Sequence, residues 1–181
     1  MKSLLLFSII SMLTLSGIEF NFGTNHNSQN WRIVNDGVMG GLSKSEIKLS
    51  KNTLLFKGET SLKNNGGFAS IRTSFKPGIL KGCKTMTIKF KSNTTNRSFG
   101  ISLKDKERFY MPYFKHIFSP KTNNWQTLTV NLEDFKPYRI SETFDAKMPL
   151  SYLDNVFTLV LIISDKKQGD FDIELDHISF N

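Results

Sequence analysis

Thr85-Met86-Thr87-Ile88-Lys89-Phe90-Lys91 alternates polar and apolar residues without a break. Successive side chains of a β-strand point to opposite faces, so this stretch predicts a strand with one face in a core and the other in water. Gln126-Thr127-Leu128-Thr129-Val130-Asn131-Leu132 repeats the pattern. Together they predict an antiparallel sheet that is covered on one face only.

Other short apolar runs, bounded by turn residues, extend this pattern along the chain. Val156–Ile163 is almost entirely apolar, which is typical of a central strand covered on both faces. The further strands that we expect are Ile18–Phe22, Glu46–Ser50, Leu54–Gly58, Phe68–Phe75, Phe99–Leu103, Arg108–Phe114 and Phe171–Phe180. About ten short strands without a long helix predict an all-β fold, an antiparallel β-sandwich or jelly roll.

Two segments depart from regular alternation. Periodicity fails between Pro137 and Pro149, where we expect a long irregular loop, and Leu150–Leu153 can form a single helical turn. In the last strand the apolar phase switches near Asp176-His177, which predicts a β-bulge there.

The N-terminus has the order of a secretory signal peptide. Lys2 precedes an apolar run from Leu4 to Leu15, and the small residues Ser16-Gly17 follow. The run is too short to span a bilayer comfortably, although part of it could instead be a buried first element. We expect residues 1–17 to be removed on export to the periplasm or beyond and 18–181 to form one domain without a stable membrane span; a cytoplasmic or organellar location is the alternative.

The chain carries a formal charge of +8, from 24 Lys and Arg against 16 Asp and Glu. Its lysines are scattered and form no basic run, so the sequence favours a solvated sheet face over nucleic-acid binding. Cys83 is the only cysteine, which excludes an intrachain disulfide.

Two glycine-rich motifs, Asn35–Ser43 and Asn64–Arg72, require backbone that turns tightly or is approached closely. Neither has the spacing of a phosphate-binding loop. We expect these loops to contact a protein partner, with Asp36 and Asn65 bracing the turns and Arg72 supplying charge. Asp36 and Arg72 can alternatively pair with each other. The candidate binding residues in the two motifs are Asp36, Met39, Gly40, Gly41, Ser43, Asn65, Gly66, Gly67 and Arg72.

Aromatic residues offer a second candidate site. Arg108, Tyr110 and Tyr113 combine ring faces with hydrogen-bond donors, which suits a sugar or a peptide, and Trp125 and Tyr138 could add to them.

Catalytic or metal-binding patterns are weak. The three histidines, His26, His116 and His177, are far apart and lie in no catalytic motif, so we expect no enzyme and no cofactor. Alternate positions of the last strand place four carboxylates on one face. A solvated acidic face explains this pattern more simply than a Ca²⁺ site does; the residues are Asp170, Asp172, Glu174 and Asp176.

Several motifs resemble the complex I intermediate-associated protein family over Phe20–Phe180. The resemblance begins with Trp31-Arg32-Ile33-Val34 and the two glycine motifs, and it continues in Trp125-Gln126-Thr127-Leu128, 132–137 and 171–178. It implies a galactose-binding-like β-sandwich. Mitochondrial members are chaperones that assemble respiratory complex I, related domains are non-catalytic modules, and similar sandwiches bind sugars. The resemblance therefore implies an assembly or scaffold role through protein contacts; the alternative is a carbohydrate-binding module of an exported protein.

Overall fold

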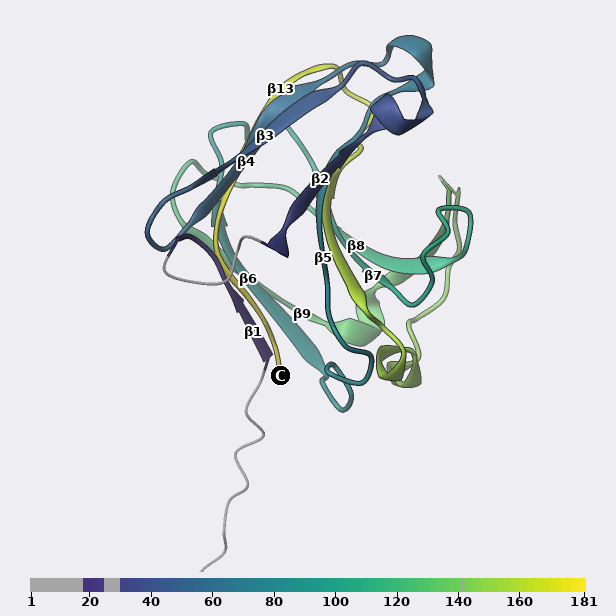
Figure 1. Ribbon diagram of the computed structural model, residues 1–181. Helices are drawn as coiled ribbons and strands as arrows, with labels where there is room; N and C mark the ends of the chain where they lie inside the picture. Colours follow the sequence, from purple (N-terminus) through teal and green to yellow (C-terminus); the bar gives the residue numbers. More distant parts are fainter. Residues whose placement is uncertain (1–17, 25–29, 141) are drawn as a thin grey trace, which may run out of the picture.

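The computed structural model describes residues 18–24, 30–140 and 142–181. The predicted signal peptide and His26 lie outside the described residues. Two antiparallel sheets pack face to face as a β-sandwich, which confirms the predicted fold class (Figure 1).

The first sheet has six strands. In spatial order these are β3 (Lys44–Leu49), β4 (Leu54–Thr60), β13 (Gly169–Phe180), β6 (Thr85–Lys91) and β9 (Gln126–Asn131), with β1 (Ile18–Asn21) paired to the end of β13. The alternation from Thr85 to Lys91 produces β6 as predicted, with the side chains of Met86, Ile88 and Phe90 buried. The register of β13 shifts between Leu175 and His177, which confirms the predicted bulge.

The second sheet has seven strands. In spatial order these are β11 (Glu142–Thr143), β10 (Lys136–Arg139), β8 (Tyr113–Phe118), β7 (Phe99–Lys104), β12 (Thr158–Ile163), β5 (Ala69–Ser74) and β2 (Arg32–Asn35). Short 3₁₀ helices join some strands: η2 (Asp36–Met39), η3 (Lys63–Asn65), η4 (Leu132–Asp134) and η5 (Leu150–Asp154). The last of these includes the helical turn predicted at Leu150–Leu153.

The predicted strand Arg108–Phe114 is wrong in its position. Residues 105–112 instead form the turn between β7 and β8, and the strand runs from Tyr113 to Phe118. Charged residues 105–108 and Pro112, which has no amide hydrogen for a ladder, explain why pairing begins only after them. The irregular loop predicted after Pro137 also contains two short edge strands, β10 and β11.

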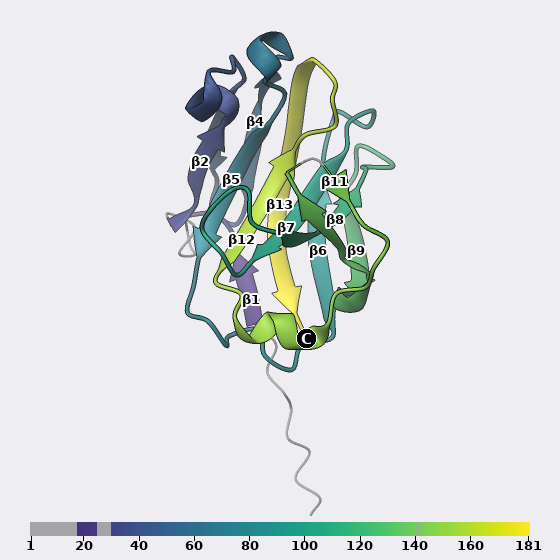
Figure 2. The same ribbon diagram turned by 90° about the vertical axis from the view of Figure 1, so that its right-hand side faces the viewer.

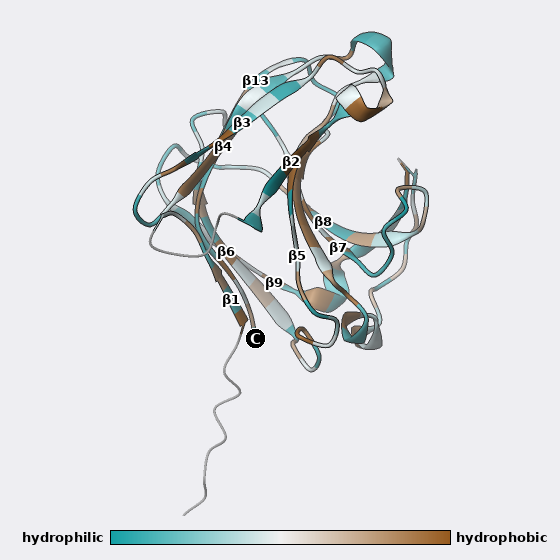
Figure 3. Ribbon diagram, in the orientation of Figure 1, coloured by the Kyte–Doolittle hydropathy of each residue, from teal (hydrophilic) through white to brown (hydrophobic). Residues whose placement is uncertain are grey.

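Apolar side chains from both sheets meet in one core, where phenylalanine rings pack edge to face. Figure 3 shows hydrophobic residues along many strands and hydrophilic ones in many of the turns. None of the helices in the described ranges is long and apolar enough to cross a membrane.

The seven-stranded sheet turns its other face to solvent, and this face is called the open face below. Figure 2 looks onto it, and Figure 1 shows that the sheet curves so that the face is concave. Alternate residues of each strand point there. One row across the sheet runs through Arg32, Arg72, Val160, Ser102, Lys115 and Lys136.

Candidate functional site

The two glycine motifs lie against each other around the carboxylate of Asp36, which is 1% exposed. Its Oδ1 accepts a hydrogen bond from the backbone amide of Ser43 at 2.9 Å. Its Oδ2 accepts bonds from the Ser43 hydroxyl and from the amides of Gly67 (2.6 Å) and Phe68 (3.2 Å). Burial alone would raise the pKa of Asp36, but these hydrogen bonds outweigh it and hold the pKa below its usual value. Asp36 therefore fastens both loops to each other.

The glycines are required by this contact. A Cβ on Gly41 would collide with the Asp36 side chain, and a Cβ on Gly66 would lie 2.6 Å from Asp36 Oδ2. Gly40 and Gly67 have φ angles of 87° and 122°, a region that favours glycine. The motifs are thus matched to one another through close packing.

Asn64, the neighbour of the predicted Asn65, adds a second link between the motifs because its side-chain amide donates to the carbonyl of Gly40 at 3.1 Å. Asn64 and Asn65 both adopt left-handed backbone angles, with φ of 55° and 57°. Asparagine tolerates this region better than most residues with a side chain. The turn at 64–67 is therefore built by both asparagines and both glycines.

The fastened loop presents apolar side chains to solvent. Val38 is 71% exposed, Met39 66% and Leu42 51%. Leu62, which is 44% exposed, lies beside Gly67 in the facing loop. This group of four is called the apolar loop surface below. A rigid loop that exposes large apolar groups is suited to contact another protein.

Arg72 lies apart from this centre, on the open face. Its Nε donates to the Ser70 hydroxyl at 3.3 Å. The Asp36 carboxylate is engaged by Ser43, Gly67 and Phe68, so the predicted alternative of an Asp36–Arg72 pair is wrong.

The open face collects cations and tyrosines from strands that are distant in the sequence. The Tyr113 and Tyr138 rings are stacked, with centroids 6.1 Å apart and an interplanar angle of 23°. Lys104 Nζ lies 4.6 Å from the centre of the Tyr113 ring, and Lys115 Nζ lies 3.9 Å from that of Tyr138. These contacts are favourable cation–π interactions. Between these groups and Arg72 the floor combines the aliphatic residues Val160 and Ile162 with small residues, Gly100, Ser102 and Thr158, and Ser70 and Ser74 flank Arg72 on β5.

The electrostatics of the open face are unusual. Burial, together with the charges of Arg72 and Lys115, lowers the pKa of Lys104 to about 8. Burial lowers the pKa of Lys115 to about 8 as well. Arg72 also has a lowered pKa because it is buried and lies near Arg32. The site therefore holds several positive charges that repel one another in a partly desolvated setting.

Arg108 and Tyr110 lie in the turn that leads into β8, whereas Tyr113 lies on β8 itself. Arg108 Nη1 donates to the Tyr110 hydroxyl at 2.6 Å, and Phe109 packs against the Tyr110 ring. The three predicted residues thus belong to one hairpin, but Tyr113 has Lys104 and Tyr138 as its close neighbours. Trp125 lies on the other sheet, where Lys91 Nζ is 4.9 Å from its ring centre.

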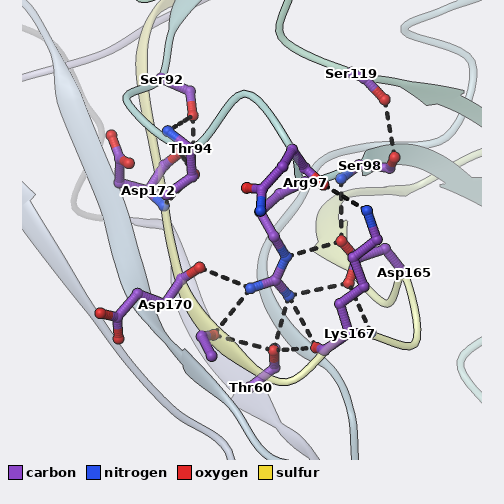
Figure 4. Close-up of polar contacts among 12 residues, drawn as sticks. Thr60, Ser92, Thr94, Arg97, Ser98, Ser119, Asp165, Lys167, Asp170 and Asp172 are labelled. Atoms are coloured by element: carbon purple, nitrogen blue, oxygen red, sulfur yellow. Dashed lines mark hydrogen bonds and ion pairs between the residues drawn. The ribbon is translucent and has the colours of Figure 1, made fainter.

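A buried arginine joins the β6–β7 connection to the β12–β13 connection and to the end of β4. Arg97 is 2% exposed and holds Asp165 with two bonds of 2.8 and 3.0 Å (Figure 4). It also donates to the Thr60 hydroxyl and to the carbonyls of Lys167, Gly169 and Asp170. Burial would raise the pKa of Asp165, but bonds from Arg97 and the Ser98 amide keep it below the usual value. Every donor of this guanidinium group has a partner within the protein, so Arg97 has a structural role.

The acidic residues of β13 are mostly engaged by neighbours on the six-stranded sheet. Glu174 pairs with Lys91 at 2.8 Å, Asp176 pairs with Lys89 at 3.3 Å, and Asp172 accepts from the Asn93 amide at 3.0 Å. Within the described ranges no group of three or more His, Cys, Asp or Glu side chains is arranged to hold a metal.

Sequence reasoning named Tyr138 as a possible addition to Tyr113 but missed Lys104 and Lys115. The signal for these residues was their position among the alternate residues of β7, β8 and β10 whose side chains point to the open face. That signal becomes readable only once these strands are known to be neighbours of β12 and β5.

Solved structures with the same fold include carbohydrate-binding modules. The family 11 module from Clostridium thermocellum, in complex with a β-1,3-1,4-mixed-linked tetrasaccharide, has a TM-score of 0.65 and 15% identity and covers 91% of this chain and 95% of its own. The family 11 module of the cellulase Lic26A-Cel5E of Clostridium thermocellum has a TM-score of 0.59 and 16% identity, covering 83% and 86%. An agarase matches with a TM-score of 0.58 and 11% identity, over 90% of this chain and 24% of its own.

Sequence comparison identifies the family directly. No curated protein matches the chain. The model of complex I intermediate-associated protein 30, however, matches residues 20–175, which include both glycine motifs and most of both sheets. The chain therefore belongs to the complex I intermediate-associated protein 30 family.

Proposed function

We propose that this protein is a non-catalytic binding module that takes a carbohydrate on its open face. The observation that carries this proposal is the stacked pair Tyr113–Tyr138 beside a floor of small and aliphatic residues on a concave sheet. Tyrosines combine apolar rings with hydroxyl groups, and lysine and arginine donate to sugar oxygens. Two solved structures of the same fold are described as carbohydrate-binding modules, one with a bound tetrasaccharide, which supports this choice.

A glycan array followed by titration calorimetry tests the proposal. We expect selective binding, and we expect Tyr113→Ala and Tyr138→Ala to weaken it at least tenfold, corresponding to about 1.4 kcal/mol. Trp125→Ala is the matched control, since Trp125 is an aromatic residue with 39% exposure on the other sheet. Absence of any bound glycan, or equal binding by all three variants, would contradict a carbohydrate site here.

The second candidate function is an assembly or scaffold role, and the apolar loop surface favours it. The Asp36 centre fixes this loop before any partner arrives, so little conformational entropy is lost on binding. In this role the loop is positioned by Asp36, Ser43, Asn65, Gly40, Gly41, Gly66 and Gly67. The contact is made by Val38, Met39 and Leu42. The family match supports this candidate at the level of the family.

Capture from the native host separates the two functions. Met39→Ser should reduce recovery of a specific protein partner without affecting glycan binding. Lys51→Ser, at an exposed turn, is the control. A protein partner captured equally by both variants would exclude the apolar loop surface as the contact.

Export is part of the carbohydrate proposal, because the extracellular space is where such a module meets polysaccharide. We infer that residues 1–17 are removed, leaving a chain that starts near Gly17 to Glu19. Intact mass of the protein from its own host tests this, and recovery with Met1 still attached would contradict it.

A further inference from the structure

Four cations on the open face lack a carboxylate partner among the residues that the structure describes. Elsewhere on the protein, lysines such as Lys57, Lys91 and Lys136 form ion pairs with Asp or Glu. The four on the open face are Arg32, Arg72, Lys104 and Lys115. Within the described structure, other unpaired lysines such as Lys44 and Lys84 are exposed to water. By contrast, Lys115 is buried, and Arg72 and Lys104 are partly buried. The segments 1–17, 25–29 and position 141 contain no Asp or Glu, so they cannot supply the missing carboxylates.

The register places these cations on both sides of the floor formed by β12 and β7. Arg32 and Arg72 are directly opposite each other on β2 and β5. Lys115 lies in the same row, three strands from Arg72, at a distance of about 14 Å for a strand spacing of about 4.8 Å. Lys104 is in the adjacent row, beside Tyr113. A chain-like ligand across the floor would therefore meet positive charge at both ends.

This arrangement is unfavourable in the free protein. Like charges that lie directly opposite each other on neighbouring strands destabilise a sheet. Arg32 and Arg72 are such a pair. Lys115 is only 8% exposed, yet its ammonium donates no hydrogen bond in the structure. No fully buried side-chain nitrogen in the described ranges lacks a partner, so this ammonium still reaches the surface. The lowered pKa values of both lysines agree with an unsatisfied site.

We propose that the ligand of the open face is an anionic saccharide whose carboxylate or sulfate groups are held by Arg72, Arg32, Lys115 and Lys104. This inference rests on the proposed carbohydrate function and adds the charge of the ligand. An anion would supply the counter-charge that the chain itself does not provide. Arginine forks bind carboxylate or sulfate with two hydrogen bonds, and the lysines act as point charges.

The surroundings favour a saccharide over other polyanions. Tyr113 and Tyr138 contribute rings and hydroxyls at the same face, a combination that suits sugar rings. The sheet that carries the positive groups is concave (Figure 1), whereas a flat membrane would be met by protruding groups. At the edge of this face, Asp145 pairs with Lys136 at 2.9 Å and neutralises its charge.

The test uses matched pairs of polymers with the purified protein. Polygalacturonate is compared with its methyl ester, and dextran sulfate with dextran. We expect at least one charged member to bind ten times or more tightly than its neutral partner, with affinity that falls as salt rises. The pair that responds tells whether the group is a carboxylate or a sulfate.

Variants separate a built site from attraction to a protein of net charge +8. Lys104→Ala/Lys115→Ala and Arg72→Ala should each lower affinity for the charged polymer at least tenfold. Lys51→Ala/Lys84→Ala removes the same number of charges at exposed positions on the other sheet and should change it less than threefold. Melting temperatures show that the variants fold.

Each other outcome overturns the inference in a recognisable way. Equal affinity for charged and neutral members would agree with the carbohydrate function but would contradict an anionic ligand. An equal loss in the control double variant would reduce the effect to net charge. Binding of duplex DNA or phosphatidylserine vesicles through the same residues, with no saccharide bound, would place a different anion on the face and overturn the carbohydrate function too. No binding of any probe would overturn both.

Discussion

Asp36 and Lys115 are both charged side chains that folding largely removes from water, and their surroundings differ completely. Asp36 is 1% exposed and accepts four hydrogen bonds from Ser43, Gly67 and Phe68. Lys115 is 8% exposed, has no carboxylate partner in the described structure, and lies near other cations. A satisfied buried charge holds the fold together, whereas an unsatisfied one lowers stability and needs another reason to be there. We take ligand binding to be that reason.

The largest effect is expected where a satisfied buried charge loses its partner. Arg97→Ala should lower stability by about 3–5 kcal/mol because it leaves the buried Asp165 carboxylate without its partner and removes a donor from three carbonyls. For a domain of this size the melting temperature should fall by roughly 10 °C or more. Arg139→Ala, at an exposed position, is the control and should change it little. Similar melting of both variants would mean that the Arg97 network contributes little.

Asp36→Asn tests the other satisfied centre with almost no change in shape. In one orientation the new amide group faces the Ser43 amide, and in the other it faces the amides of Gly67 and Phe68. Either way a donor meets a donor, so we expect a loss of about 2–3 kcal/mol in urea denaturation. Asp145→Asn is the control because Asp145 is fully exposed at the surface. Stability within 0.5 kcal/mol of wild type would show that Asp36 does not hold the loops.

A glycine pair sharpens the same point. Gly66→Ala places a methyl group 2.6 Å from Asp36 Oδ2 and 2.8 Å from the Ser61 carbonyl, so we expect a loss of about 1–3 kcal/mol. Gly37→Ala in the other motif meets nothing within 4 Å and should be close to neutral. The comparison is made by thermal unfolding monitored by circular dichroism. Equal effects would mean that close packing is not why these motifs carry glycine.

Local patterns predicted the parts of the fold that depend on neighbouring residues. The alternation at 85–91 and 126–131 gave strands with the expected buried face, because strand periodicity is a property of consecutive residues. The bulge near Asp176 could also be predicted locally, because the apolar residues of the last strand switch to the other alternate positions there. The short edge strand β2 was not predicted, since Arg32 and Ile33 are exposed and leave little alternation to detect.

The candidate site was less accessible because it depends on strand order. The glycine motifs could be recognised as special in sequence, but the separation of Arg72 from Asp36 appears only in three dimensions. Lys104 and Lys115 looked like scattered solvated lysines. Pairing of β7 with both β8 and β12 brings them to one face with Arg72, and no local pattern encodes that pairing.

On the open face, removal of a charge should increase stability, whereas the substitutions at Arg97 and Asp36 decrease it. Lys115→Met keeps the aliphatic volume and removes a charge whose pKa burial lowers to about 8, so the variant should be more stable at pH 7 by about 1 kcal/mol. Affinity for the ligand should fall in the same variant. Lys91→Met is the control, since it breaks the 2.8 Å pair with Glu174 and should not stabilise the protein. A destabilised Lys115→Met variant would assign this lysine to architecture.

The smallest effect is expected from pH, and it separates binding from stability. The pKa values of Lys104 and Lys115 are about 8 in the folded protein, below the ordinary 10.5, so the unfolded chain binds more protons between these two limits. Stability contributed by the lysines should therefore rise as pH increases from about 8 to 10.5, whereas affinity for an anion should fall over the same range. The other charged or titratable groups on this face are Arg32, Arg72, Tyr113, Lys136 and Tyr138.

The arginines stay charged through this range, and burial raises the pKa of Tyr113 above its usual value. Burial also raises the pKa of Cys83. This shift lowers stability as pH rises above the usual pKa of a thiol, so its effect is opposite in sign to that of the two lysines. The informative quantity is thus the difference between wild type and the double variant Lys104→Met/Lys115→Met, measured by urea denaturation and by calorimetry from pH 7 to 10. That difference in stability should shrink as the wild-type lysines lose their protons. A constant difference would show that both lysines remain ordinary surface cations, and the contrast with Asp36 would then no longer distinguish function from architecture.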